Sequence, residues 1–215
     1  MRSSSVVGAR FAEIVTSESE LRALIGHPSE VVLKGRLAAL DEHCRAYIAK
    51  SPFVIVASAD AGGAIDVSPK GDPAGFVQVL DDSTLAIPER PGNRRADTFS
   101  NVLQNPHVAL IFLIPGKQET LRVSGSATIV RDRWLREQMT IAGKAPTLAL
   151  VVAIEEVSIH CAKCVIRSKL WDPRHWPDLD GVPSLAQAIV DQAQLTKTLE
   201  QVQAFIDDDI RTRLY

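Results

Sequence analysis

The stretch that decides the fold is FVIVASADAGGAIDVS, residues 53–68. Its first part, Phe53–Ser58, is a short apolar run rich in β-branched residues, and its last part, Ala64–Ser68, is a second run of strand composition. Asp60–Gly63 between them has the composition of a tight turn. The three pieces together predict an antiparallel β-hairpin at the start of a β-rich region.

Beyond this hairpin the chain continues as strand-like segments joined by turns. Strands are predicted at residues 75–79, 84–87, 108–114, 120–130 and 148–160. One helix, Asn93–Leu103, interrupts them, and a short second helix is predicted to start near Asp132. About six strands with hairpin connections predict an antiparallel barrel rather than an alternating β-α-β sheet.

Helical segments flank the predicted barrel, which covers residues 53–172 of a single domain spanning 1–215. The N-terminal part, 1–50, contains a capping-box pair at Ser17 and Glu20 and then a second helix predicted from about Gly35 to Lys50. The C-terminal part, 184–206, has apolar residues at near-heptad spacing and predicts one long amphipathic helix. That helix either packs on a partner subunit or folds back on its own barrel.

Composition limits the partners and the compartment. The chain has 215 residues, 46% of them hydrophobic, and a formal net charge of −2, which predicts neither nucleic-acid nor anionic-membrane binding. No apolar run reaches the roughly 20 residues needed to span a bilayer. Met1–Ser5 lacks the apolar stretch of a secretory signal, and the three cysteines form no disulfide framework, so a cytoplasmic location is expected.

Two polar segments of the barrel region could hold an anion. In Ser68–Pro73, a hydroxyl, the Lys70 ammonium and a glycine amide are suitable phosphate donors, although a surface turn alone explains the segment better. In Pro88–Arg95, Asn93 is predicted to cap a helix whose first turn carries Arg94 and Arg95. Cations there oppose the helix dipole, and a bound phosphate would turn this penalty into an attraction.

A third segment, Glu119–Ala127, places one arginine within an apolar strand. Strand alternation puts Arg122 on the face opposite Leu121 and Val123, where it either pairs with a neighbouring acid or reaches a ligand. Gly125 in the same strand predicts a β-bulge or the close approach of another group.

These segments together resemble the pyridoxamine 5′-phosphate oxidase-like FMN-binding split-barrel family over roughly residues 53–172. The order of the parts carries the resemblance: Ser68-Pro69-Lys70-Gly71, Leu85-Ala86-Ile87-Pro88, Arg94-Arg95, Asn105-Pro106-His107-Val108-Ala109-Leu110 and Arg122-Val123-Ser124-Gly125. The ending Arg167-Ser168-Lys169-Leu170-Trp171 resembles a branch known only as FMN-dependent enzymes of unassigned substrate.

The resemblance implies a six-stranded antiparallel split barrel with N-terminal helices and a long C-terminal helix. It also implies that FMN lies at the interface of a homodimer, with its phosphate held by Lys70, Arg94 and Arg95. The remaining residues that it implies for the cofactor are Val67, Ser68 and the backbone of Ile87 and Pro88 along the flavin, Thr120 where the oxidases carry a glutamine, Arg122, and Arg167, Ser168 and Trp171 reaching over from the second subunit.

The sequence departs from the oxidases at the substrate end. Trp171–Trp176 and a helix stand where those oxidases carry a substrate-binding segment with Arg and His, so pyridoxamine phosphate is not expected as the substrate. Trp171 could equally be a core or interface aromatic. The predicted function is an FMN-dependent oxidoreductase acting on a small-molecule redox substrate, with a nicotinamide as a candidate electron donor and no side chain assigned to catalysis.

Three alternatives stay open from the sequence. One is a flavin carrier or sensor without turnover, or a barrel holding haem or a deazaflavin, for which His107 and His160 are the only strand-placed axial ligands. Another is an interaction protein that works through its C-terminal helix. The last concerns Cys161-x-x-Cys164, which is half of a zinc motif but is better explained as small buried cysteines, so no metal site is predicted.

Overall fold

The computed structural model describes residues 10–215, and the chain divides into two compact units, residues 1–36 and 37–215. Met1–Ser5, on which the expected compartment partly rests, lies outside the described residues. The first unit contains α2 (Glu18–Ile25) and α3 (Glu30–Lys34). Helix α2 begins where the sequence predicts it, because the Ser17 hydroxyl accepts a hydrogen bond from the Glu20 amide at 3.2 Å.

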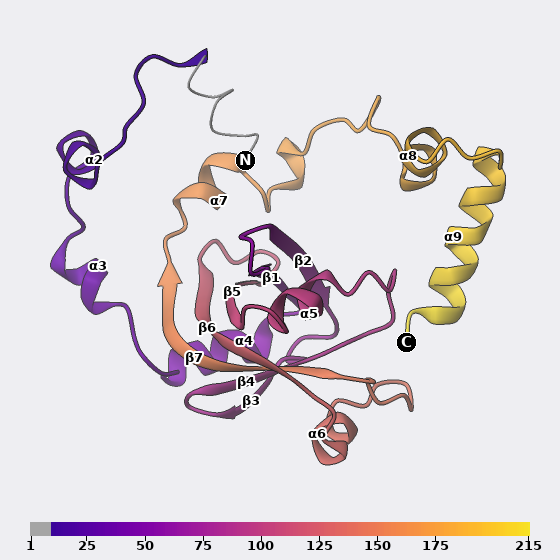
Figure 1. Ribbon diagram of the computed structural model, residues 1–215, viewed down its shortest axis with the longest axis horizontal. Helices are drawn as coiled ribbons and strands as arrows, with labels where there is room; N and C mark the ends of the chain where they lie inside the picture. Colours follow the sequence, from indigo (N-terminus) through magenta and orange to yellow (C-terminus); the bar gives the residue numbers. More distant parts are fainter. Residues whose placement is uncertain (1–9) are drawn as a thin grey trace. The chain divides into compact units, whose positions relative to one another are not determined.

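The second unit is built on one antiparallel sheet with the strand order β2-β1-β5-β6-β7-β4-β3. The strands are β1 (Phe53–Ala59), β2 (Ile65–Gly71), β3 (Gln78–Asp81), β4 (Thr84–Pro88), β5 (His107–Leu113), β6 (Thr120–Val130) and β7 (Ala149–His160). The sheet curves strongly without closing, as Figure 1 shows. The predicted number of six strands is wrong, because the sheet has seven. Every predicted strand segment pairs with a neighbour, including the two that form the edges of the sheet.

The core lies on the concave face of this sheet. Alternate residues of β1, β5 and β6 are fully buried there, among them Val54, Phe112 and Leu121. Helix α4 (Glu42–Lys50) adds Tyr47 and Ile48 to the same core and packs against β6 and β7. The predicted helix from Gly35 to Lys50 is wrong in its start, because the Asp41 carboxylate accepts from the Cys44 amide at 2.8 Å and begins α4 only at Glu42.

Strand β4 is buried on both of its faces. Leu85 and Ile87 point into the main core, and Ala86 packs with Leu135 and Met139 in a second apolar cluster. That cluster is closed by the short helix α6 (Arg133–Gln138), which begins after Asp132 as predicted. The C-terminal end of β4 is therefore held firmly where it reaches the candidate site.

A β-bulge in β6 confirms the prediction made from Gly125. The register with β7 shifts between Ser124 and Gly125, and a Cβ atom on Gly125 would lie 2.0 Å from the main-chain oxygen of Ala153. Only glycine fits at this crossing.

Two helical predictions are wrong. Helix α5 covers Asp97–Val102 and packs against β1 and β2, so Arg94 and Arg95 precede the helix and do not lie in its first turn. The C-terminal region forms two helices, α8 (Leu185–Gln192) and α9 (Leu199–Arg213), which pack on each other. They are separate because Thr198 starts α9 with its own capping box, formed with Gln201.

Two short helices complete the unit, α7 (Lys163–Ser168) after β7 and the 3₁₀ helix η1 (Pro173–His175). Within residues 10–215, no helix combines the length and the apolar composition that crossing a membrane requires.

Candidate functional site

A pocket of about 920 Å³ opens beside the edge strand β2. Its near wall comes from β2, from the end of β4, from the loop 89–96 and from the first turn of α5. Its far wall comes from distant parts of the chain: Lys144, Ala145, Pro146, Thr147, Arg213 and Tyr215. The volume is at the upper end of the range usual for small-molecule and cofactor sites, about 300–1,000 Å³.

The pocket is cationic although the chain as a whole is slightly acidic. Six basic side chains line it against three acidic ones: Lys70, Arg90, Arg94, Arg95, Lys144 and Arg213 against Asp66, Glu89 and Asp97. The formal charge of the chain is −2, so the excess of positive charge is local to this pocket. Such a concave cationic surface attracts anionic ligands.

Lys70 is fixed in the wall of the pocket. Its ammonium lies 3.0 Å from the Glu89 carboxylate and 5.8 Å from the centre of the Phe99 ring. About a fifth of its side chain is exposed, and Lys70 lines the pocket. The pair with Glu89 at the end of β4 holds Lys70 in one position.

The loop that carries the two arginines has an unusual backbone. Arg94 and Ala96 adopt left-handed φ angles of +63° and +56°, which non-glycine residues rarely take. The Asn93 side chain supports the loop by accepting from the Arg95 amide at 3.0 Å. Arg95 pairs with Asp97 at 2.7 Å, whereas Arg94 has no ion-pair partner within residues 10–215. Backbone strain of this kind concentrates at binding sites.

A buried ion pair lies behind the near wall of the pocket. Arg90 donates to the Asp72 carboxylate at 2.5 Å and to the main-chain oxygen of Met139 at 2.9 Å. The Asp72 side chain is 1% exposed and that of Arg90 is 16% exposed. A charged pair with so little access to water is held in one geometry by its surroundings.

Tyr215 lies against this ion pair from the far wall. The Arg90 guanidinium is 5.9 Å from the centre of the Tyr215 ring, and the Lys144 ammonium donates to the main-chain oxygen of Tyr215. Burial, followed by a hydrogen bond to the Asp72 carboxylate, raises the pKa of the Tyr215 hydroxyl. Lys144 is presented by a tight turn in which Ala142 and Gly143 have left-handed φ angles.

Half of the residues expected to bind a cofactor line this pocket. They are Val67, Ser68, Lys70, Pro88, Arg94 and Arg95. The other half lie elsewhere: Ile87, Thr120, Arg122, Arg167, Ser168 and Trp171. The structure therefore brings together the segments around β2, β4 and α5 and separates them from β6 and the region after β7.

The residues outside the pocket have structural contacts of their own. The Ile87 side chain is 2% exposed and points into the core, and Thr120 is buried at the start of β6. Arg122 is exposed on the convex face, opposite the buried Leu121 and Val123, as strand alternation predicts. The Trp171 indole donates to the main-chain oxygen of Lys117 at 2.8 Å.

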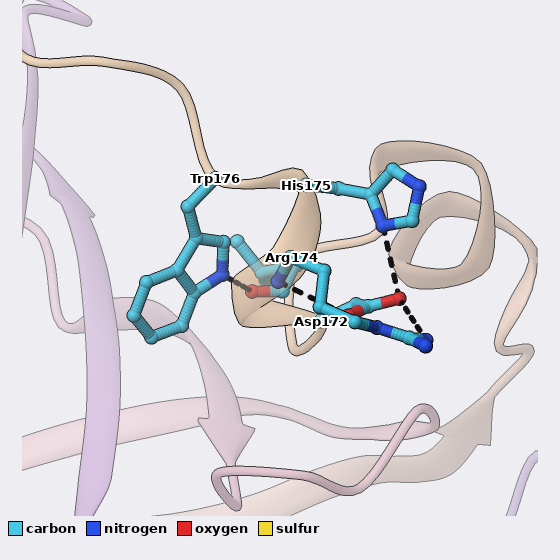
Figure 2. Close-up of polar contacts among 5 residues, drawn as sticks. Asp172, Arg174, His175 and Trp176 are labelled. Atoms are coloured by element: carbon cyan, nitrogen blue, oxygen red, sulfur yellow. Dashed lines mark hydrogen bonds and ion pairs between the residues drawn. The ribbon is translucent and has the colours of Figure 1, made fainter.

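The segment after α7 forms a separate polar cluster around Asp172, shown in Figure 2. Arg174 donates to its carboxylate with two nitrogens at 2.9 Å each, and the His175 ring nitrogen Nδ1 lies 3.0 Å away. Hydrogen bonding from Arg174 lowers the pKa of Asp172 to about 2. The cluster is exposed and holds η1 together, and none of its residues lines the pocket.

The prediction that Cys161 and Cys164 are small buried cysteines is wrong. Cys44 is buried in the core, but Cys161 and Cys164 are exposed. Cys164 lies in the first turn of the short helix α7, so the pair stands at a helix start, where the sequence had indicated only the end of a strand. Within residues 10–215, no group of three or more His, Cys, Asp or Glu side chains is arranged to hold a metal ion.

Several pocket residues were not predicted from the sequence. Arg90 and Glu89 stand within the basic segment that pointed to the site, so local composition could have found them. Lys144, Arg213 and Tyr215 are brought in by the β6–β7 pairing and by α9. No local pattern marks these three residues, since their place depends on contacts between distant segments.

Fold and pocket together define a class of protein, an open antiparallel barrel with a cationic cavity beside its edge strand. The sequence profile of the pyridoxamine 5′-phosphate oxidase family matches residues 40–161, more than half of the chain. The chain belongs to this family, which confirms the resemblance found in the sequence. A comparison with curated protein sequences found no match.

Solved structures give weaker likenesses. HupZ of Group A Streptococcus is 16% identical with a TM-score of 0.46, over 57% of this chain and 98% of that one. An FMN-binding protein of Syntrophomonas wolfei is 13% identical with a TM-score of 0.43, over 72% and 96%. An F420 reductase is 17% identical with a TM-score of 0.42, over 55% and 98%. The family assignment rests on the sequence profile and not on these structures.

Proposed function

We propose that the chain is an FMN-dependent oxidoreductase that works as a homodimer and holds the flavin in the cationic pocket. The observation that carries this proposal is the excess of six basic over three acidic side chains in a cavity of about 920 Å³. A flavin mononucleotide needs a site for a phosphate with about two negative charges, and a wall for a planar ring system. Family membership supports the same cofactor.

Arg94 and Lys70 are the side chains best placed to take the phosphate. Arg94 is not committed to an ion pair among the described residues, and its left-handed backbone projects it from the loop at the pocket wall. Lys70 is anchored by Glu89, lines the pocket and keeps about a fifth of its side chain exposed. Arg95 would have to share its guanidinium between Asp97 and the phosphate, so its contribution is expected to be smaller. Charge-assisted hydrogen bonds of this kind are the strong ones.

The remaining wall fits the rest of the cofactor. Val67 and Ser68 on β2 and Pro88 at the end of β4 line the pocket next to Lys70, and the backbone of Ile87 continues the β4 edge. When bound, the flavin would supply the hydride or electron transfer chemistry, and the protein would supply binding and orientation. We therefore assign no side chain as a general acid or base.

The convex face of the sheet supports the homodimer. Val67 on β2, Ala57 on β1 and Ala109 on β5 are in register across the three strands. On the same face, Ile65 pairs with Ala59, and Ile111 on β5 pairs with Ile55 on β1. Ile65 is 76% exposed and Val67 is 59% exposed, a strongly apolar surface for a sheet face in water. Val67 belongs both to this face and to the pocket lining, so a second copy covering the face would also border the pocket.

The proposal is tested by titrating FMN into purified protein and following flavin fluorescence. Arg94→Ala is expected to weaken FMN binding about tenfold or more, since a charge-assisted hydrogen bond is worth about 1.5–3 kcal/mol. Arg94→Ala with Arg95→Ala is expected to cost several kcal/mol. Arg131→Ala, an exposed arginine outside the pocket, is the control. Wild-type protein that ignores FMN, or an Arg94→Ala variant with wild-type affinity, would contradict the proposal.

The second candidate function is a flavin, haem or deazaflavin carrier without turnover. Haem is the least favoured ligand of this pocket, because His107 and His160 are both exposed and neither lines it. The absorption spectrum of the freshly purified protein separates flavin from haem. Bleaching of the bound flavin by a nicotinamide donor separates an enzyme from a carrier.

A further inference from the structure

The pocket has more room and more positive charge than one phosphate site needs. Lys70, Arg94 and Arg95 gather at the β2 and α5 side, whereas Lys144 and Arg213 belong to the far wall. Arg90, on the loop 89–96, lies 5.9 Å from the ring of the far-wall residue Tyr215. Arg90 is matched by the buried Asp72, and Arg213 pairs with Asp209 at 2.6 Å. The Lys144 ammonium donates to the main-chain oxygen of Tyr215 and forms no ion pair with an Asp or Glu side chain of the described residues. The far end of the pocket therefore offers an ammonium group to a second ligand.

Tyr215 shows which chemical groups this end accepts. Its ring lies over the Arg90 guanidinium, its hydroxyl contacts Asp72, and its main-chain oxygen accepts from Lys144. Tyr215 thus offers its aromatic ring to the Arg90 guanidinium and an oxygen acceptor to the Lys144 ammonium. Arginine stacks well on aromatic faces, and an ammonium prefers an anionic oxygen.

The contacts of Tyr215 with Arg90 and Lys144 are of a type that a free ligand could replace. Tyr215 lies beyond the last residue of α9, Arg213, and its neighbour Leu214 is 60% exposed. Tyr215 is itself only partly buried and belongs to neither of the two apolar core clusters. A free molecule that carries the same groups could make the same contacts in its place.

We propose that Arg90 and Lys144 form a second subsite for an aromatic molecule bearing a carboxylate, and that Tyr215 occupies this subsite until such a ligand displaces it. If the pocket holds a flavin, aromatic carboxylates are the substrate class that this subsite would bind. Only the description of the ligand as a substrate rests on the proposed function. Because Tyr215 competes from within the chain, the apparent affinity for the ligand falls with the fraction of molecules in which Tyr215 is bound.

The test measures binding of 3-(4-hydroxyphenyl)propionate by calorimetry, with and without saturating FMN. Tyr215→Ala is expected to bind this probe about tenfold more tightly than wild type, as follows if Tyr215 occupies the subsite in about nine-tenths of the molecules. Leu214→Ala, which truncates the exposed neighbour, is the matched control and is expected to behave as wild type. Adding Lys144→Ala to Tyr215→Ala is expected to reverse the gain.

Two comparison probes define the ligand class. Hexanoate, a carboxylate without a ring, and 4-propylphenol, a ring without a carboxylate, are both expected to bind Tyr215→Ala more weakly than 3-(4-hydroxyphenyl)propionate. Equal binding of the aromatic carboxylate to Tyr215→Ala and Leu214→Ala, or equal binding of hexanoate, would overturn the subsite. If Tyr215→Ala binds the probe more tightly but the protein does not bind FMN, the flavin proposal is wrong and the subsite stands. If the protein binds FMN but Tyr215→Ala binds the probe no more tightly than wild type, the subsite is wrong and the flavin proposal stands.

Discussion

Gly125 is the residue where the fold tolerates least change. A methyl group there would meet the main-chain oxygen of Ala153 at 2.0 Å, and backbone cannot move aside as a flexible side chain can. Gly125→Ala is therefore expected to lower the free energy of unfolding by about 1–3 kcal/mol, the usual cost of overpacking, as measured by urea denaturation. Gly92→Ala, where the added methyl meets no atom within 4 Å, is the control. A Gly125→Ala protein as stable as this control would contradict the close crossing of β6 and β7.

The three cysteines are expected to differ sharply in reactivity. Burial is the main cause that raises the pKa of the Cys44 thiol to about 11, and the side chain of Cys44 lies in the core. Cys161 and Cys164 are exposed. Iodoacetamide at pH 8 should therefore label Cys161 and Cys164 in the native protein and label Cys44 only after urea is added, as read by peptide mass spectrometry, because the thiolate is the reacting form. Labelling of native Cys44 at the rate of the other two would show that α4 is not packed as described.

At the residue scale, local chemistry predicted individual positions well where one rule decides them. Gly125 and the outward-facing Arg122 follow from strand alternation and from the steric freedom of glycine. The same kind of argument failed for Cys161 and Cys164, because the exposure of a small residue depends on what packs over it. Tyr215 and Lys144 had no local signal.

At the scale of single elements, the start of α4 depends on one side chain. The Asp41 carboxylate accepts from the Cys44 amide at 2.8 Å, and this hydrogen bond is the main cause that lowers the pKa of Asp41. Asp41→Ala is expected to cost about 1 kcal/mol of unfolding free energy at neutral pH. Because the folded-state pKa is lowered, the stabilisation is present above the unfolded value of about 3.8 and is lost as the pH falls through the folded value.

The matched control is Asp132→Ala. Asp132 also precedes a helix, α6, but its side chain makes no capping hydrogen bond. Urea denaturation of both variants at pH 7 and pH 3 tests this prediction. The loss of unfolding free energy in Asp41→Ala should be smaller at pH 3 than at pH 7, and Asp132→Ala should have nearly the wild-type unfolding free energy at both pH values. Equal deficits in the two variants would argue against the Asp41 cap.

Element existence was easier to predict than element boundaries. Every strand of the sheet has a predicted counterpart, since alternation and turn residues are local signals. Helix α5 was predicted four residues too early, because Asn93 has cap chemistry but uses it on the Arg95 amide in a turn. The long C-terminal helix was predicted as one because its apolar spacing continues across the break, whereas the capping box at Thr198 ends that continuity.

At the scale of the whole molecule, the apolar convex face predicts how copies associate. Ile65→Lys together with Ile111→Lys is expected to turn a dimer into a monomer, because two buried, unpaired charges would face the partner. Analytical ultracentrifugation at several concentrations measures the change. Leu179→Lys, at a 70% exposed position outside the sheet, is the control. A wild-type protein that sediments as a monomer, or a double variant that stays dimeric, would remove this face from the proposed interface.

The arrangement of the whole molecule was only partly predictable. The sequence indicated an antiparallel β fold and six of the residues that line the pocket, because the parts of the near wall are close together along β2, β4 and the loop 89–96. The far wall comes from the turn before β7 and from the end of α9, and the pairing that brings them there is set by tertiary packing. The openness of the sheet was likewise not readable from strand patterns alone.

That open sheet leaves two borders, β2 and β3, whose outward main-chain groups could template the addition of foreign strands. Each border carries a safeguard: Pro69 interrupts the donors of β2, and β3 is only four residues long, with an irregular register against β4. Concentrated solutions of the folded protein should consequently resist stacking into amyloid-like fibres, so that any self-association runs through side chains on the sheet face and stops at a finite size.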